Sequence, residues 1–266
     1  MKHALALYFL SLRLQIKSYN MYRFNFWLGI IGILSLYSTQ LFVIITILQR
    51  FEHINGWNIF EVGLLFGFWL LTYGVMIFFF AGVRDFTYLV QSGNFDVLLL
   101  RPHNLLLQVM SGRAELNAWA HTLFGLAAVL FCLFNLNFEW SVYNLFKLVQ
   151  IILGGALVQG GLLLLWAAIS FWMLNTTALV DLGWSINANY LTYPLSAYNS
   201  IVKNVFTFFP LGFITYYPVS WLLEKNGAYD SWSFLGPYTF LVGITFLLVT
   251  YSFWIFASKY YKSTGN

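Results

Sequence analysis

The sequence predicts an all-α protein that crosses a membrane six times, after an N-terminal helix lying along the membrane surface. Hydrophobic residues make up 60% of the 266 residues and charged residues only 8%, whereas soluble domains hold about 25% charged residues. Six apolar runs each approach the roughly 20 residues that a helix needs to span the hydrocarbon core. The 13 Lys and Arg residues are also divided unevenly between the two ends of these runs, which is typical of membrane proteins.

The first 22 residues predict a separate interfacial helix. Its apolar positions fall on one helical face, and cations flank that face. The apolar positions are Leu5, Tyr8, Phe9, Leu12 and Ile16, and the cations are Lys2, Arg13 and Lys17. This pattern is typical of an "elbow" helix in the membrane interface; a cytoplasmic helix packed on the rest of the protein is the alternative. No small-x-small cleavage site follows, so we expect the segment to be retained.

The six spans predict a single membrane domain covering residues 1–266. The apolar runs are 26–48, 62–83, 116–136, 146–171, 201–223 and 238–256. Pro210 interrupts the fifth run, where it would bend a helix and form a hinge, a cavity wall or an ordinary kink. If the N-terminus is cytoplasmic, ten of the 13 cationic residues face the cytoplasm and three face outward. This bias predicts that both termini are cytoplasmic.

The loop at residues 84–113 is the most informative part of the chain. Residues 92–108 read SGNFDVLLLRPHNLLLQ, with two leucine triplets that a plain connection does not need. Gly93 allows a turn, and Pro102 suits the first position of a new helix while directing Arg101 away from helical geometry. We therefore expect a helix, a turn, a short helix, a break at Arg101–Pro102 and another short helix. The loop is either an interfacial hairpin or a docking surface for a soluble partner.

The segment at residues 175–200 is too polar for an ordinary lipid-facing span. It contains Asn175, Thr176, Thr177, Asp181, Asn187 and Asn189. We expect it to form a second cytoplasmic element before the fifth span, with a second docking surface as one use for it.

Two polar residues inside spans are candidates for a pathway or for packing. His121 lies at helical spacing from Arg113 and Asn117, with Glu115 beside them, and such groups either mark a pathway or pair at the interface. Gln159 lies within GGALVQGG at residues 154–161. Small residues there indicate close helix packing, and Gln159 either completes that packing or lines a cavity.

The sequence argues against several functions. One cysteine, Cys132, and four scattered histidines give no metal-ligand spacing and no catalytic cluster, so we expect neither a metal site nor an enzyme. An intramembrane enzyme is the weaker alternative. An ion-gradient-driven carrier is another, but it predicts deep acids and internal repeats that are not evident. Few charges also argue against nucleic-acid binding.

The loop sequence resembles a known family signature. The resembling string is Ser92-Gly93-x-Phe95-Asp96-x-Leu98-Leu99-Leu100-Arg101-Pro102-x-Asn104-x-Leu106. It is similar to that of type-2 exporter permeases of bacterial ATP-binding-cassette (ABC) transporters, in the uncharacterised, daunorubicin-exporter-like branch. Shorter matching strings are Gly56-Trp57, Phe171-Trp172, Tyr193-Pro194-Leu195 and Tyr216-Tyr217-Pro218, so the resemblance covers most of the chain.

The resemblance implies a permease subunit in the bacterial inner membrane, in which six spans follow an elbow helix. The loop after the second span would contact a separate ATPase subunit that binds ATP and Mg. This chain has no G-x-x-x-x-G-K-[ST] phosphate loop and would hold no cofactor itself. A second permease, identical or homologous, would complete the pathway. The residues expected to couple to the ATPase are Ser92, Gly93, Asp96, Arg101, Pro102 and Asn104. Neither substrate nor direction of transport follows from the sequence.

Overall fold

The described chain is a bundle of long helices. The computed structural model describes residues 23–51, 53–113, 115, 117–173, 176–225 and 232–262, together with positions 10, 13 and 17. Regular structure in these residues is helical, apart from one isolated bridge between Ile54 and Trp57. Five helices are long and apolar enough to cross a membrane. The prediction of an all-α polytopic protein is confirmed, whereas the predicted elbow helix at residues 1–22 lies almost entirely outside the described residues.

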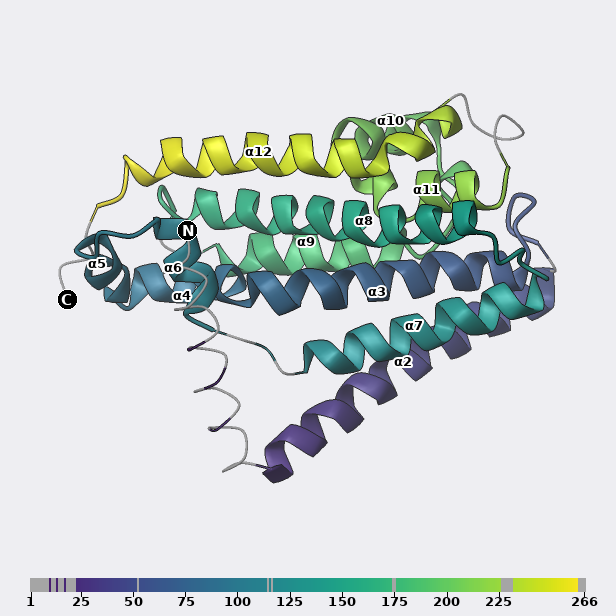
Figure 1. Cartoon of the computed structure of the whole chain (residues 1–266), viewed down its shortest axis with the longest axis horizontal. Helices are drawn as coiled ribbons and strands as arrows, with labels where there is room; N and C mark the ends of the chain where they lie inside the picture. The colour runs from purple at the N-terminus through teal and green to yellow at the C-terminus, as the bar shows by residue number, and fades with distance from the viewer. Residues whose placement is uncertain are drawn as a thin grey trace.

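Five long helices correspond to five of the predicted spans. They are α2 (Arg23–Phe51), α3 (Ile59–Arg84), α7 (Ala118–Asn135), α8 (Val142–Ile169) and α12 (Thr239–Ser258). Helices α12, α8, α3 and α7 follow one another across the bundle, and α2 meets α7 at one end before diverging from it (Figure 1). The short helices of residues 84–113 cap what we call the loop end of the bundle, and the connection between α2 and α3 lies at the opposite end.

Glycines set how closely these helices approach. A Cβ built at Gly125 of α7 would lie 2.5 Å from the backbone nitrogen of Leu71 in α3. One at Gly154 of α8 would lie 2.7 Å from Cγ2 of Thr239 in α12. Larger residues at these positions would force the helix pairs apart. The expectation that the glycine-rich run at residues 154–161 packs between helices is therefore confirmed.

The segment expected as a second cytoplasmic element instead runs through the bundle. Helix α9 (Thr177–Tyr190) begins at the loop end, where Thr176 Oγ1 lies 2.6 Å from the hydroxyl of Thr87. After α9, the chain reaches the opposite end, where Asn55 Nδ2 donates to the carbonyl of Ser196 at 2.7 Å. Its 14 residues cover about 21 Å at 1.5 Å per residue. The described part of the segment, residues 176–200, therefore crosses the bundle, although its polarity had argued against a span.

The predicted fifth span at residues 201–223 is broken. Helix α10 (Ser200–Phe208) is followed by the turn η2 (Leu211–Phe213) and by α11 (Tyr216–Leu222), with a bend of 77° between the two helical parts. Buried Pro210 lies at the bend, where it donates no backbone hydrogen bond.

This broken segment enters and leaves at the same end of the bundle. Ser196, before it, contacts Asn55, and Lys225, after it, donates from Nζ to the carbonyl of Gly56 at 2.9 Å. It is therefore re-entrant, and the crossings among the described residues are α2, α3, α7, α8, α9 and α12. On this path Lys203 belongs with Arg50, Lys147 and Lys225 at the opposite end rather than with the cationic residues of the loop end. The charge bias used for orientation is weaker but keeps its direction.

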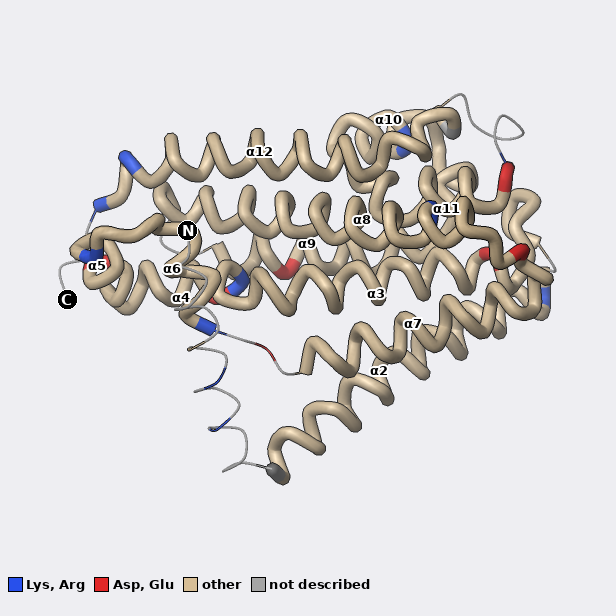
Figure 2. The backbone as a smooth tube through the Cα atoms, in the orientation of Figure 1, with Lys and Arg blue, Asp and Glu red and all other residues tan. Residues whose placement is uncertain are grey.

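Charged residues lie mainly towards the two ends of the bundle (Figure 2). At the opposite end, two ion pairs fasten the re-entrant segment. Lys225 Nζ lies 2.7 Å from Oε2 of Glu61, whose carboxylate also caps the start of α3. Lys147 Nζ, on α8, lies 3.6 Å from Oε1 of Glu224, and only 2% of the Lys147 surface is exposed.

Candidate functional site

The loop at residues 84–113 folds as the sequence predicts. Helix α4 (Phe86–Gln91) leads into a left-handed turn at Gly93, with φ of 69°. Helix α5 (Asn94–Leu99) follows, the chain breaks at residues 101–104, and α6 (Leu105–Ser111) completes the loop. A side chain at Gly93 would strain this turn. The predicted order of helix, turn, helix, break and helix is confirmed.

Local hydrogen bonds account for two of the predicted residues in this loop. Ser92 Oγ donates to the carbonyl of Leu89 at 3.3 Å and accepts from Asn94 Nδ2 at 2.9 Å, which steadies the turn before α5. Asn104 Oδ1 accepts from the backbone N–H of Leu107 at 3.1 Å. It therefore caps α6, directly after the break that contains Pro102.

The loop is tied to the last helix of the bundle and to the chain that follows it. The hydroxyl of Tyr261 donates to Asp96 Oδ1 at 2.8 Å, and Asn104 Nδ2 donates to the hydroxyl of Tyr251 at 2.9 Å. Phe95 is fully buried, with its ring centroid 4.8 Å from that of Tyr261. The loop at residues 84–113 is therefore attached both to α12 and to the chain that follows it.

The tip of the loop exposes apolar surface beside a cation. Leu100 is 86% exposed, and Val97, Leu99 and Leu107 are also exposed. Arg101 is exposed and makes no ion pair with Asp96 or any other described residue. Arg101 and Pro102 line a hollow of about 570 Å³ between the short helices and the end of α3. These exposed leucines and Arg101 form what we call the loop tip.

Four charged residues form a network where α3 meets the loop. Arg84 pairs with Glu115, Arg113 pairs with Asp85, and Arg84 Nε lies 3.7 Å from Asp85 Oδ1. The network joins the end of α3 to the link between α6 and α7. Two cations and two carboxylates balance one another, and Glu115 and Arg113 pair with Arg84 and Asp85 rather than with each other.

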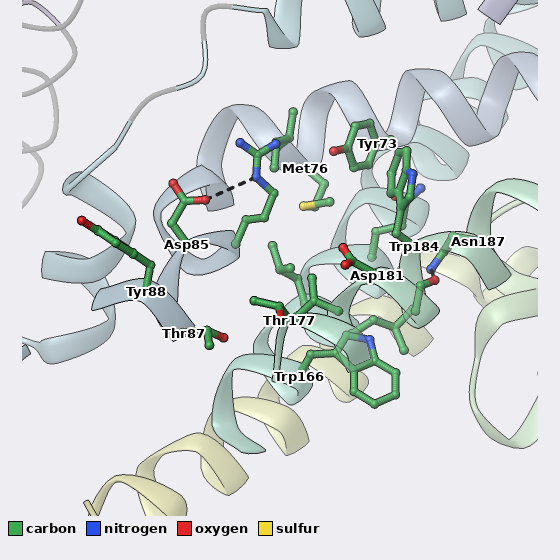
Figure 3. Close-up of a pocket in the computed structure, with 17 residues that line it drawn as sticks. Tyr73, Met76, Asp85, Thr87, Tyr88, Trp166, Thr177, Asp181, Trp184 and Asn187 are labelled. Carbon is green, nitrogen blue, oxygen red and sulfur yellow. Dashed lines mark hydrogen bonds and ion pairs between the residues drawn. The ribbon is translucent and has the colours of Figure 1, made fainter. Parts of the chain in front are cut away.

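A groove of about 400 Å³ opens between α3, α8 and α9. Figure 3 shows Asp181 and Trp184 of α9 around the same space as Tyr73 and Met76 of α3, with Trp166 of α8 on another side. The Trp184 and Tyr73 ring centroids are 4.4 Å apart. At the loop end the lining includes both partners of an ion pair in the charge network, Arg84 and Asp85, so the groove reaches the base of the docking loop.

Helix α9 carries a polar stripe along one exposed face. Thr177, Asp181, Ser185 and Asn189 recur every four residues and are all exposed in this chain. Asn189 Nδ2 donates to the carbonyl of Ser185 at 2.9 Å. Thr177 and Asp181 line the groove, and Ser185 and Asn189 line a second hollow beside α2. Polar groups within a membrane face water or another protein surface rather than lipid. The stripe therefore marks a face that lipid does not cover.

His121 and Gln159 are both held by neighbouring helices. His121 is 8% exposed, and its Nδ1 lies 2.8 Å from the hydroxyl of Tyr37, so it joins α7 to α2. Gln159 Nε2 donates to Thr72 Oγ1 at 2.7 Å, and its side chain borders the groove. His121 lines a separate hollow between α2 and α9. Pro210 lies in the re-entrant segment and lines neither the groove nor this hollow.

The sequence did not single out the residues that define the groove. Tyr73, Trp166 and Trp184 were indistinguishable from the many other aromatic residues. Asp181 was noted only as part of a polar segment. An acid at helical spacing from Thr177 and Ser185 was the available signal, because such a stripe predicts one polar face on a membrane helix.

Comparison with known proteins gives one match. A family model described as "ABC-2 family transporter protein" matches residues 34–265. No curated protein and no solved structure matches the chain significantly.

Proposed function

This chain belongs to the ABC-2 family of transporter proteins, as a membrane-embedded permease component, and we propose that it serves an ATP-driven exporter of the bacterial inner membrane. A separate ATPase subunit holds ATP and Mg and binds the loop tip. A second permease, identical or homologous, completes the pathway beside the groove. The observation that carries this proposal is the loop at residues 84–113, which exposes its tip and is attached to the two long helices α3 and α12.

The loop tip has the composition of a docking surface. Exposed leucines supply contact area, and Arg101 offers a charge without a partner in the described chain. Interfaces combine an apolar centre with a few polar groups that set orientation. A loop that only connected two spans would gain nothing from exposing Leu100 at its apex.

The loop is also built to transmit movement. Its α6 lies against α3, where Gly82 permits backbone contact with Val109, and its α5 is bonded to Tyr261 beyond α12. Helix α3 borders the groove. A push on the loop tip therefore reaches a helix that lines the proposed pathway.

The polar stripe of α9 supports a second permease. A stripe containing Asp181 is costly against lipid, whereas a water-filled passage between two permeases would hydrate it. The groove beside Asp181 would then form part of the passage wall. The charge bias of the chain supports an orientation in which the loop end faces the cytoplasm.

The first test is assembly with an ATPase. Co-expression with candidate ABC ATPase subunits from the same genome should yield, with one of them, a complex that survives detergent purification. Replacement Arg101→Glu should reduce co-purification about tenfold, the change produced by 1.4 kcal/mol. Arg50→Glu, which makes the same charge change on an exposed residue at the opposite end, should leave co-purification unchanged. Absence of any ATPase partner would reject the proposed function, and equal effects of both variants would reject docking through Arg101.

A second test addresses orientation. Cys132 is the only cysteine in the sequence and is buried, so Leu100→Cys adds one accessible thiol. A membrane-impermeant maleimide should label it in inside-out vesicles but not in intact cells. Labelling from outside intact cells would reverse the proposed topology.

A further inference from the structure

The groove between α3, α8 and α9 carries an unbalanced negative charge. Its charged lining residues are Arg84, Asp85 and Asp181. Arg84 and Asp85 belong to the network in which Arg113 and Glu115 complete two opposite-charge pairs. Asp181 has no hydrogen bond or ion pair with any described residue. The balanced network therefore leaves Asp181 as the charge that a ligand would meet.

Aromatic faces surround this carboxylate. Trp184 remains 37% exposed while its ring packs against Tyr73. Trp166 approaches the backbone of α9 at Gly183, where a Cβ would lie 2.6 Å from Trp166 Nε1. Aromatic faces attract cations, most strongly when water is displaced. A carboxylate beside such rings favours a positively charged ligand with an apolar body.

A further polar atom on the same helix matches this preference. Asn187 lines the groove, and its Oδ1 is buried without a hydrogen-bond donor in the described chain, while its Nδ2 donates to the carbonyl of Gly183 at 2.9 Å. The groove lining thus combines the carboxylate of Asp181 with a second polar side chain of α9, that of Asn187. A cation beside Asp181 would supply the positive charge that no described side chain supplies to this carboxylate.

Building on the permease role proposed above, we propose that this groove binds an organic cation with an aromatic or aliphatic body. Asp181 supplies the counter-charge, and Trp184 with Tyr73 contacts the body. The volume of about 400 Å³ falls within the range of sites that hold drug-sized ligands. Asp181 lies about 6 Å along α9 from Thr177, so a cation entering from the loop end meets it early. Anionic cargo would be repelled by the same carboxylate.

A binding measurement without ATP tests the site independently of ATPase coupling. The protein is purified together with any subunits that remain bound to it, and the assembly is reconstituted into lipid nanodiscs. Binding of radiolabelled tetraphenylphosphonium, a permanent cation, is compared with that of triphenylphosphine oxide, a neutral molecule with similar rings. Wild-type protein should bind the cation saturably and more tightly than the neutral probe. Asp181→Asn should weaken cation binding about tenfold and leave neutral binding unchanged.

Two controls separate the site from general charge and folding effects. Asp181→Glu keeps the charge and should retain cation binding within about threefold. Glu139→Gln removes an exposed acid at the opposite end and should behave as wild type. A preference for the cation that survives Asp181→Asn, or wild-type protein without saturable cation binding, overturns the proposal.

A measurement on unaltered protein covers the case in which Asp181→Asn fails to fold. A lipid-soluble carbodiimide should modify the Asp181 carboxyl, as read by peptide mass. Tetraphenylphosphonium should protect Asp181 from modification, and triphenylphosphine oxide should not. Equal protection by both probes, or by neither, contradicts a cation site. Loss of ATPase assembly with intact cation binding would instead count against the proposed function alone.

Discussion

Replacing Gly82 with Ala should separate the docking loop from the bundle. A Cβ at Gly82 of α3 would lie 1.9 Å from the carbonyl oxygen of Val109 in α6, whereas ordinary contact begins at 3.4 Å. Helix α6 must therefore move by about 1.5 Å, because the clashing atom is backbone and cannot rotate away. Overpacking of this kind costs about 1–3 kcal/mol, and Ala regains about 1 kcal/mol through helix propensity. We expect a net loss of stability of about 0–2 kcal/mol, together with a loss of coupling caused by the displacement of α6.

The assay compares transport per ATP hydrolysed with thermal unfolding of the purified complex. Gly32→Ala, in α2, adds the same methyl group with no atom within 4 Å and should not reduce either quantity. Gly125→Ala clashes with the backbone of Leu71 at 2.5 Å and should lower stability without displacing α6. Coupling should therefore fall further in Gly82→Ala than in Gly125→Ala at equal stability. Wild-type coupling and stability in Gly82→Ala would refute the tight contact between α3 and α6.

Two further predictions concern ties at opposite ends of the bundle. Lys225→Met leaves the carboxylate of Glu61, whose side chain is 12% exposed, without its cation, and it should lower stability by about 2 kcal/mol. The double variant Lys225→Met with Glu61→Gln removes the unpaired charge and should unfold at a higher temperature than Lys225→Met alone. Equal melting temperatures of the two variants would contradict this. Tyr261→Phe removes the hydroxyl that donates to Asp96 and should weaken the tie by about 1–2 kcal/mol. The weakened contact should appear as faster amide hydrogen exchange in α5, with exchange in α3 unchanged. Unaltered exchange in α5 would argue that the Tyr261–Asp96 hydrogen bond does not hold α5 in place.

The sequence was sufficient for elements whose signals are local. Gly93 and Pro102 act on their own backbone geometry, so the order of short helices at residues 84–113 was predictable. Long apolar runs likewise predicted α2, α3, α7, α8 and α12. Contacts between distant residues, such as Asp96 with Tyr261, leave no local pattern. The hydrogen bond from Tyr261 to Asp96 joins residues 165 positions apart in the sequence.

The prediction of the fifth span, at residues 201–223, was wrong for a physical reason. Apolar content identifies helices that face lipid, but α9 presents a polar stripe to a surface that lipid does not cover, so its Asp181 and Asn189 argued against a span. Residues 201–223 were predicted to span the membrane because they are apolar, but a re-entrant segment can be equally apolar without crossing the bundle. Pro210 was the visible warning, because a proline within an apolar run removes the backbone bond that a straight helix requires.

Asp85 connects the two functional regions of the chain. It lines the groove and also the hollow beneath the loop tip, and its carboxylate pairs with Arg113 while lying 3.7 Å from Arg84. A displacement of the loop that moves Arg113 must therefore alter the charge surroundings of Arg84 at the mouth of the groove. Since the energy of an ion pair depends on the separation of its charges, a movement of the loop would change the charge surroundings that the groove presents. Under the proposed function, the same four residues would link ATPase contact at the loop tip to a ligand in the groove.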